Sequence, residues 1–150
     1  MTKPIAILFA GAMLLAGAAQ ARQAADAATP AQATAATTAA ATESATRWLA
    51  LTDSARWAES WEEMAPAAQA MVTRANWTST LPSVRDPLGA VKARKLQSAT
   101  FTNAMPGAPA GDYVLIQYVT EFANKPQSME TVVPMLLPDG RWKVSGYFVR

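Results

Sequence analysis

Two glutamates in the second half of the chain have a spacing that acid–base chemistry could use. Glu121 and Glu130 flank the segment 124–127 (NKPQ), which is typical of a turn between two strands. If this turn is centred on Lys125 and Pro126, the two glutamates lie opposite each other, with both side chains on one face of the sheet. Two close carboxylates raise each other's proton affinity and can serve as general acid and base. In the alternative interpretation, an arginine neutralises one glutamate, or both are solvated near the hairpin end.

Two arginines and two tyrosines accompany the glutamates as candidate pocket or interaction residues. Arg85 lies at the junction between a predicted helix and a predicted strand, and Arg94 lies early in that strand. The two guanidinium groups could form an anion site at a pocket mouth. Alternatively, Arg85 binds carbonyl groups at the helix C-terminus, and either arginine neutralises a glutamate. Tyr118 or Tyr147 would assist the glutamate pair in an enzyme. We assign no catalytic residue, no metal ligand and no cofactor from these patterns.

The composition excludes several classes of chemistry. The 150 residues include no cysteine and no histidine, which rules out disulfides, thiolate nucleophiles, Ser-His-Asp catalysis and imidazole metal sites. The formal net charge is +2, which is too small for a strong attraction to nucleic acid or anionic lipid. We therefore expect no nucleic acid among the partners.

Residues 1–42 are rich in alanine, whereas the remainder carries all five tryptophans. Residues 1–21 have the order of a secretory signal peptide: a positive charge, an apolar run and an Ala-Gln-Ala cleavage pattern that ends at Ala21. The run is shorter than the about 20 apolar residues of a membrane-spanning helix. We predict cleavage after Ala21, no membrane span after cleavage, and a periplasmic or secreted protein. Residues 22–42, rich in alanine and threonine, show no apolar periodicity and predict a flexible linker. The alternative is a frayed helix that continues into the next element.

Residues 43–150 form the predicted single domain, in which helices come first and strands follow. Apolar side chains recur at spacings of three or four in the first part and alternate from Leu88 onward. This order predicts an α+β domain with two to three N-terminal helices packed on a cone-like, four-stranded antiparallel meander sheet. The expected helices cover Ser44–Ala65, 66–72 and 74–84, and the expected strands cover 90–102, 112–123, 128–137 and 141–149.

The register of the last hairpin is left open by the sequence. Asp139-Gly140 favours a tight turn. A two-residue turn places Trp142 opposite Leu137, whereas a turn with a glycine bulge places Trp142 opposite Leu136. The second register puts Glu130 on the same face as Trp142 and Phe148. A carboxylate buried there demands a partner, and an arginine of the first strand, at position 94, is the candidate.

A set of short motifs extends over residues 46–150 and is most specific at a proline–glycine loop and at the C-terminal end. The motifs are Trp48-Leu49-Ala50-Leu51, Ser60-Trp61, Trp77, Arg85-Asp86-Pro87-Leu88-Gly89, Arg94, Pro106-Gly107-Ala108-Pro109-Ala110-Gly111-Asp112-Tyr113, Phe122-Ala123-Asn124-Lys125, Glu130-Thr131 and Asp139-Gly140-Arg141-Trp142-Lys143-Val144-Ser145-Gly146-Tyr147. Together they resemble the bacterial domain of unknown function 4019 family.

The resemblance implies an exported bacterial protein without an assigned activity. It also implies an element order similar to the nuclear transport factor 2-like or cystatin-like folds, in which a curved sheet wraps over helices. The first of these superfamilies includes enzymes, binding proteins and dimerisation modules, so the fold alone does not choose a function.

We expect a non-enzymatic module that binds an unknown small ligand or an envelope protein. Apolar residues on both faces of the second strand, such as Leu115 and Ile116, favour either a homodimer through the sheet or a covered pocket. One alternative is a small lyase, isomerase or hydrolase that uses Glu121 and Glu130. Another is a cell-wall or glycan-binding module that presents tryptophan. A deep cavity with both glutamates would support the enzyme, and a flat apolar sheet face would support a protein partner.

Overall fold

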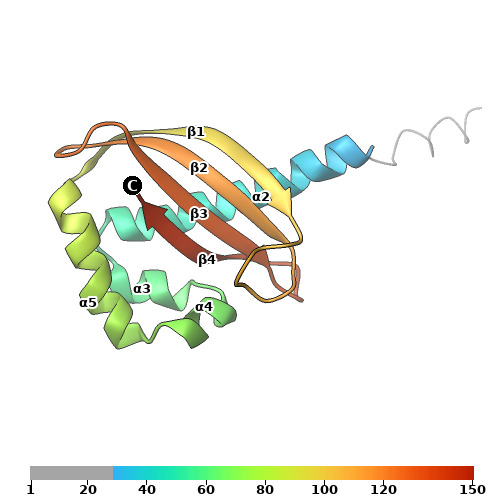
Figure 1. The fold of residues 1–150 in the computed structure, drawn as a ribbon, viewed down its shortest axis with the longest axis horizontal. Coiled ribbons are helices and arrows are strands. Elements are labelled where there is room, and N and C mark those ends of the chain that lie inside the picture. Colours follow the sequence, from blue (N-terminus) through green and yellow to red (C-terminus); the bar gives the residue numbers. More distant parts are fainter. Residues whose placement is uncertain (1–28) are drawn as a thin grey trace, which may run out of the picture. The chain divides into compact units, whose positions relative to one another are not determined.

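The computed structural model describes residues 29–150, and the predicted signal peptide with its cleavage site lies outside this range. The chain divides into two compact units, residues 1–33 and 34–150. Of the first unit, the described residues are 29–33, which open a helix. The second unit contains all four strands and the other helices (Figure 1). Among the described residues, no helix is both long enough and apolar enough to cross a membrane.

Helix α2 (Pro30–Asp53) begins well before the expected start at Ser44. The Thr29 hydroxyl accepts a hydrogen bond from the Gln32 backbone N–H at 3.3 Å, and the Gln32 side-chain oxygen accepts one from the Thr29 N–H at 2.8 Å. This reciprocal pair is a capping box, and proline is favoured at the first helical position. The helix start therefore has a local signal in the sequence Thr-Pro-Ala-Gln.

Small side chains give the middle of α2 its buried face. Ala41 and Ala45 are fully buried one turn apart and belong to the hydrophobic core. The prediction of a flexible linker over residues 22–42 is therefore wrong for residues 30–42, because alanine methyl groups pack closely without producing a strong apolar stripe. Residues 22–28 lie outside the described range.

Helix α2 ends at Asp53 in a Schellman motif, although a single helix was expected to continue to Ala65. Two backbone hydrogen bonds form the motif, from Ala55 N to Thr52 O at 3.2 Å and from Arg56 N to Leu51 O at 2.9 Å. Ala55 has a φ of 56°, in the left-handed region that glycine or asparagine usually occupies. The absence of either residue explains why the sequence does not indicate this helix end.

Short helices connect α2 to the sheet. Thr73 caps the longest of them, since its hydroxyl accepts a hydrogen bond from the Asn76 N–H at 3.2 Å. Pro82 lies inside the same helix. The elements are α3 (Trp57–Glu62), α4 (Pro66–Met71), α5 (Arg74–Arg85) and the 3-10 helix η1 (Asp86–Leu88).

The four strands form one antiparallel meander in the order β1-β2-β3-β4. Figure 1 shows α2 behind the sheet, with the shorter helices at its side. Helices followed by an antiparallel sheet confirm the predicted α+β class. The strands are β1 (Val91–Thr102), β2 (Tyr113–Phe122), β3 (Ser128–Leu136) and β4 (Trp142–Val149), each within two residues of its expected bounds.

The last hairpin adopts the second of the two registers left open. Leu136 pairs with Trp142, so Trp142 and Glu130 share the inner face of the sheet. An irregularity between Val133 and Pro134 shifts the pairing further along the hairpin. The expectation that Phe148 shares this face is wrong, because the irregularity moves it to the outer face, where it is 59% exposed.

Aromatic side chains fill the space between the helices and the inner face of the sheet. The ring of Trp48 lies 6.1 Å from that of Trp77 and 5.2 Å from that of Tyr147. The Trp48 indole N–H donates to Ser60 O at 2.8 Å, and the Trp77 N–H donates to the Ser60 hydroxyl at 3.0 Å. These tryptophans therefore serve the core, with their polar atoms satisfied.

Candidate functional site

Glu130 is the centre of a buried cluster of charged and polar groups. Its side chain is fully buried at the start of β3. Glu130 Oε2 accepts from Arg94 Nε at 2.6 Å and from the Thr120 hydroxyl at 2.5 Å. Glu130 Oε1 accepts from the Tyr147 hydroxyl at 2.6 Å and from Arg85 Nη1 at 3.1 Å. Both carboxylate oxygens are therefore occupied by hydrogen-bond donors of the chain itself.

Arg94 connects the strand end of the cluster to the end of helix α2. Its Nη1 donates to Asp53 Oδ2 at 2.7 Å, and its Nη2 donates to Asp53 Oδ1 at 2.9 Å. This forked geometry matches a guanidinium group to a carboxylate. The same side chain reaches Glu130 through Nε and Nη2. Arg94 therefore bridges two carboxylates that lie far apart in the sequence.

Arg85 makes a second bridge between the same carboxylates from the end of α5. Its Nη2 donates to Asp53 Oδ1 at 2.8 Å, and its Nη1 donates to the Tyr147 hydroxyl at 2.6 Å. The guanidinium carbon lies 4.9 Å from the centre of the Phe122 ring, within cation–π range. Arg85 Nε is buried and has no hydrogen-bond partner in the described range. The earlier idea that Arg85 binds helix-end carbonyl groups is replaced by these side-chain contacts.

The two arginines and Asp53 hold each other in their ionised forms. Burial would raise the pKa of Asp53, but the hydrogen bonds and charges of Arg94 and Arg85 outweigh it and lower the pKa below the ordinary value. Burial would lower the pKa of Arg94, but its hydrogen bonds to Asp53 and Glu130 raise it instead. Burial and the charge of Glu130 raise the pKa of Tyr147, so this hydroxyl stays protonated and donates.

The proposed pairing of Glu121 with Glu130 is wrong. Tyr118 pairs with Glu130, and Glu121 lies exposed on the opposite face of the sheet. The turn lies earlier in the chain than expected, because Phe122 and Lys125 exchange backbone hydrogen bonds of 3.1 and 3.3 Å around residues 123–124. The carboxylate dyad that the enzyme hypothesis required is therefore absent.

The structure brings together four of the six candidate residues, Arg85, Arg94, Glu130 and Tyr147. Tyr118 lies next to Glu130 on the sheet, but its buried hydroxyl has no hydrogen-bond partner in the described range and does not join the cluster. Sequence reasoning missed Asp53 and Thr120. No motif marks Asp53, whereas a correct β2–β3 register would have placed Thr120 beside Glu130.

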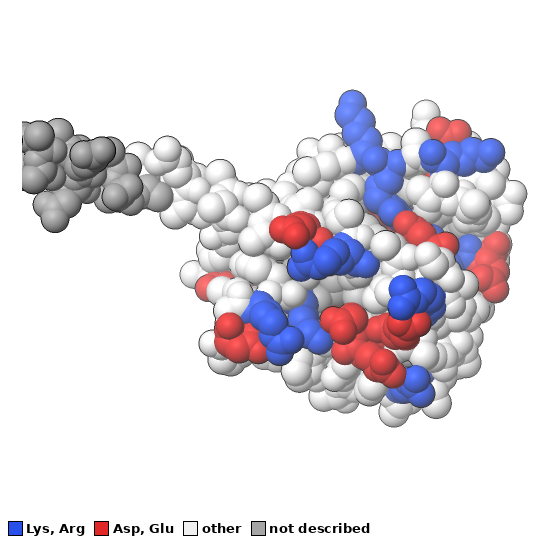
Figure 2. Space-filling view, turned by 180° about the vertical axis from the view of Figure 1, so that it is seen from behind, with Lys and Arg blue, Asp and Glu red and all other residues white. Residues whose placement is uncertain are grey.

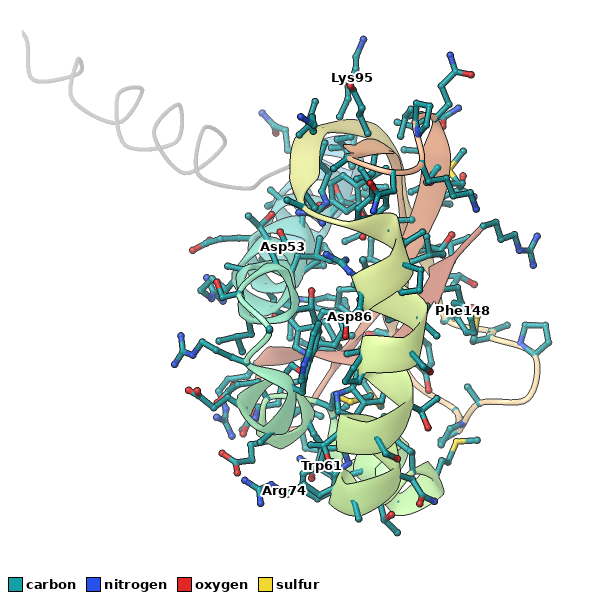
Figure 3. All side chains as sticks on the ribbon, turned by 90° about the vertical axis from the view of Figure 1, so that its left-hand side faces the viewer. Asp53, Trp61, Arg74, Asp86, Lys95 and Phe148 are labelled. Carbon is teal, nitrogen blue, oxygen red and sulfur yellow. The ribbon has the colours of Figure 1, made fainter. Side chains whose placement is uncertain are left out.

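The cluster offers little room for a substrate. A cavity of about 320 Å³ opens beside it and is lined by Asp53, Arg85 and Trp57, but not by Glu130 or Tyr147. Figure 3 shows Asp53 at the edge of this region, close to where α2 meets α3. Within residues 29–150, no group of three or more acidic residues is arranged to hold a metal ion. The arrangement is that of a buried network in which two guanidinium groups neutralise two carboxylates.

A separate surface groove of about 480 Å³ lies between α2 and β4. Trp48, Leu51 and Trp142 line it, and Arg47 and Arg141 stand at its rim with other charged residues. Both arginines are already paired with carboxylates, at 2.6 and 2.7 Å. Figure 2 shows this pairing as basic and acidic side chains side by side over much of the helical face.

The outer face of the sheet carries apolar side chains that the helices leave uncovered. Val119 is 40% exposed there, and Phe148 points away from the helices (Figure 3). Leu115, Met129 and Met135 are half-buried on the same face. One row across the sheet runs from Lys95 through Val119 and Met129 to Arg150, so cations stand at both ends of an apolar pair.

The comparison with protein-family models matches residues 44–147 to the family described as protein of unknown function (DUF4019). No curated protein and no solved structure matches the chain significantly. Because the match covers most of the chain, the protein belongs to the DUF4019 family.

Proposed function

We propose that this member of the DUF4019 family is an exported, non-enzymatic module that binds an envelope protein through the outer face of its sheet. The partner surface is apolar and flanked by carboxylates. The observation that carries the proposal is the row Lys95–Val119–Met129–Arg150, with Phe148 exposed beside it.

The non-enzymatic part of the proposal is supported by the state of Glu130. A general base needs a free lone pair directed at a substrate proton. Each oxygen of Glu130 instead accepts short hydrogen bonds from within the chain, and the carboxylate is fully buried. Glu121, the second half of the expected dyad, is on the other face of the sheet. The remaining role for this cluster is to fasten helices to strands.

Charge determines which partner suits the outer face. In residues 29–150, the basic side chains that form no ion pair are Lys92, Lys95, Lys125 and Arg150. All four lie toward the end of the sheet that carries the β2–β3 turn. Glu121 is the one acidic residue of β2 on this face. If a second copy of the chain bound through the same face, the basic side chains of the two copies would therefore lie opposite each other. An acidic partner would neutralise them and bury the apolar pair between them.

Site-specific photocrosslinking in the cells that express the protein tests this proposal. A photoreactive residue replaces Phe148 in one strain and Met71 in another. Met71 is a matched control, because it is also apolar and is 80% exposed, but it ends helix α4. We expect one envelope protein to crosslink from position 148 and not from position 71, through a segment that contains Asp or Glu.

The charge contribution is tested by Lys95→Glu in the same crosslinking background. We expect the yield from position 148 to be much lower in this variant than in the wild type. Added salt should lower the wild-type yield, since exposed charge pairs are screened, but should not lower the yield of the variant further. A crosslink to a second copy of this chain would overturn the choice of partner. Equal yields from positions 148 and 71, or no crosslink from position 148, would overturn the proposed function.

The groove between α2 and β4 favours a second candidate, a cell-wall glycan. Indole faces suit the apolar faces of sugar rings, and the charged rim supplies hydrogen-bond donors for hydroxyl and acetamido groups. Soluble oligomers of N-acetylglucosamine should quench tryptophan fluorescence in the wild type and much less in Trp142→Ala. Trp57→Ala, outside the groove, should bind as the wild type does. Equal quenching in all three proteins would reject this candidate.

A further inference from the structure

Strand β1 leaves one of its edges open. It pairs with β2 on one side and ends the strand order of the sheet. The other terminal strand, β4, is covered, because Ala65 N donates to Val144 O at 2.8 Å and Met64 bridges to Val144. Apart from its pairing with β2, no backbone hydrogen bond joins residues 91–102 to the rest of the described chain. A row of backbone donors and acceptors is therefore available to another strand.

Lysines on this strand oppose its pairing with a second copy. Lys92 and Lys95 are exposed, form no ion pair within residues 29–150, and belong to a strand that contains no acidic residue. Figure 3 shows Lys95 projecting from the sheet. Lysine on an open edge disfavours association of like edges. The same two charges favour an added strand that carries carboxylates.

The two faces of β1 carry different kinds of side chain, so the residues of an added strand would have to alternate between two chemical types. Leu96 is 46% exposed and Phe101 38% exposed, and each pairs with an inner-face residue of β2, Tyr118 and Val114 respectively. Lys95 pairs with Val119 and therefore belongs to the outer face. Successive residues of a strand point to opposite faces. An irregularity between Leu96 and Ser98 interrupts this alternation. Up to that point, a complementary strand has an apolar residue beside Leu96 and an acidic residue beside Lys95.

We propose that an extended segment of the partner, with alternating acidic and apolar residues, adds to β1 as a fifth strand. This inference rests on the proposed function, since it names the element of the partner that binds next to the outer face. Main-chain hydrogen bonds would supply affinity, and the alternation would supply specificity.

Three synthetic peptides of equal length test the proposal: five Glu-Val repeats, five Lys-Val repeats, and five glutamates followed by five valines. Binding is measured by titration, and backbone amide hydrogen exchange is measured across residues 91–102. We expect only the Glu-Val peptide to bind and to slow exchange in β1. The double variant Lys92→Glu/Lys95→Glu should bind it roughly ten-fold more weakly. Arg74→Glu, which reverses an exposed charge at the start of helix α5, is the control and should bind within about two-fold of the wild type.

Each other result overturns the inference. Equal binding of the two acidic peptides would indicate charge without strand addition, and binding without protection of β1 would place the segment elsewhere. Failure to bind the Glu-Val peptide would also reject it. A partner crosslinked from position 148 in cells would leave the proposed function intact in any of these cases. Circular dichroism of each variant checks that the fold is retained.

Discussion

The Tyr147 hydroxyl donates a hydrogen bond to Glu130 Oε1 and accepts one from Arg85 Nη1, both at 2.6 Å. One oxygen atom therefore joins the last strand to the middle of the sheet and to the end of α5. Arg94 and Asp53 extend the connection to β1 and α2. The cluster includes side chains from all four strands and from helices α2 and α5. A group in this position can fix how the helices pack on the sheet.

Tyr147→Phe is expected to lower the free energy of unfolding by about 1–3 kcal/mol, the cost of leaving buried partners without a hydrogen bond. The ring stays packed against Trp48, 5.2 Å between centroids, so the loss isolates the hydroxyl. Denaturant unfolding measures it, and Phe148→Tyr, on the exposed face, is a control that should change little. A Tyr147→Phe variant as stable as the wild type would show that the bridge contributes nothing.

Acid should weaken the fold through Asp53. Arg94 and Arg85 lower the pKa of this carboxyl in the folded state, although burial opposes them. A lowered folded pKa adds stability above the unfolded value, and this stability is lost as pH falls through the folded pKa. Asp53→Asn should therefore be less stable at neutral pH and should lose less on going to acid. Parallel curves for the two proteins between neutral and acid pH would contradict this.

Ala55→Gly should stabilise the protein. Ala55 occupies the left-handed region with φ 56°, which costs an L-residue roughly 1–2 kcal/mol. Glycine has no such penalty, although its greater freedom in the unfolded chain offsets part of the gain. We expect a net increase of about 0.5–1 kcal/mol in the free energy of unfolding. A lower melting temperature for this variant would mean that the Schellman end of α2 is not strained.

Gly89→Ala should have the opposite effect. Gly89 has a φ of 76°, and a Cβ there would lie 3.0 Å from Asn124 Nδ2 and 3.1 Å from Ala123 Cβ. The strain and the contact together should cost about 1–3 kcal/mol. Gly107→Ala, with the same φ but open space around it, separates the two causes. If both variants lose the same free energy of unfolding, the whole effect comes from the positive φ and not from the contact with Asn124 and Ala123.

Much of the fold could be predicted from the sequence because its signals are local. Alternating apolar residues and the Asp139-Gly140 turn place all four strands, and the glycine-bulge register already puts Glu130 beside an arginine at position 94. The start and the end of α2 were missed for different reasons. The capping box at Thr29 begins a segment whose alanines form no clear apolar stripe, whereas the end at Ala55 has no glycine to mark it.

Four candidate residues lie in one cluster, but the cluster does not have the chemistry that was expected of them. The register expected for the β2–β3 hairpin differs from the one in the structure. The expected register puts Glu121 on the same face as Glu130 and so predicts a dyad that the chain does not have. The arginines were identified without Asp53, because a continuous helix would have left that carboxylate on a solvent-facing side. Contacts between elements distant in the sequence depend on where each element ends, and single-residue errors there reverse which face a side chain occupies.

The central claim is that Glu130 is a structural carboxylate, neutralised by Arg85 and Arg94, and its most direct test is the stability of Glu130→Gln. The substitution keeps the shape and removes the charge, which leaves two guanidinium groups facing Asp53 alone. We predict a loss of about 3–5 kcal/mol in the free energy of unfolding, as for a broken buried ion pair. Glu121→Gln, on the exposed face, should change it by less than about 0.5 kcal/mol. If Glu130→Gln is as stable as Glu121→Gln, the carboxylate does not hold the fold together, and this account of the cluster is wrong.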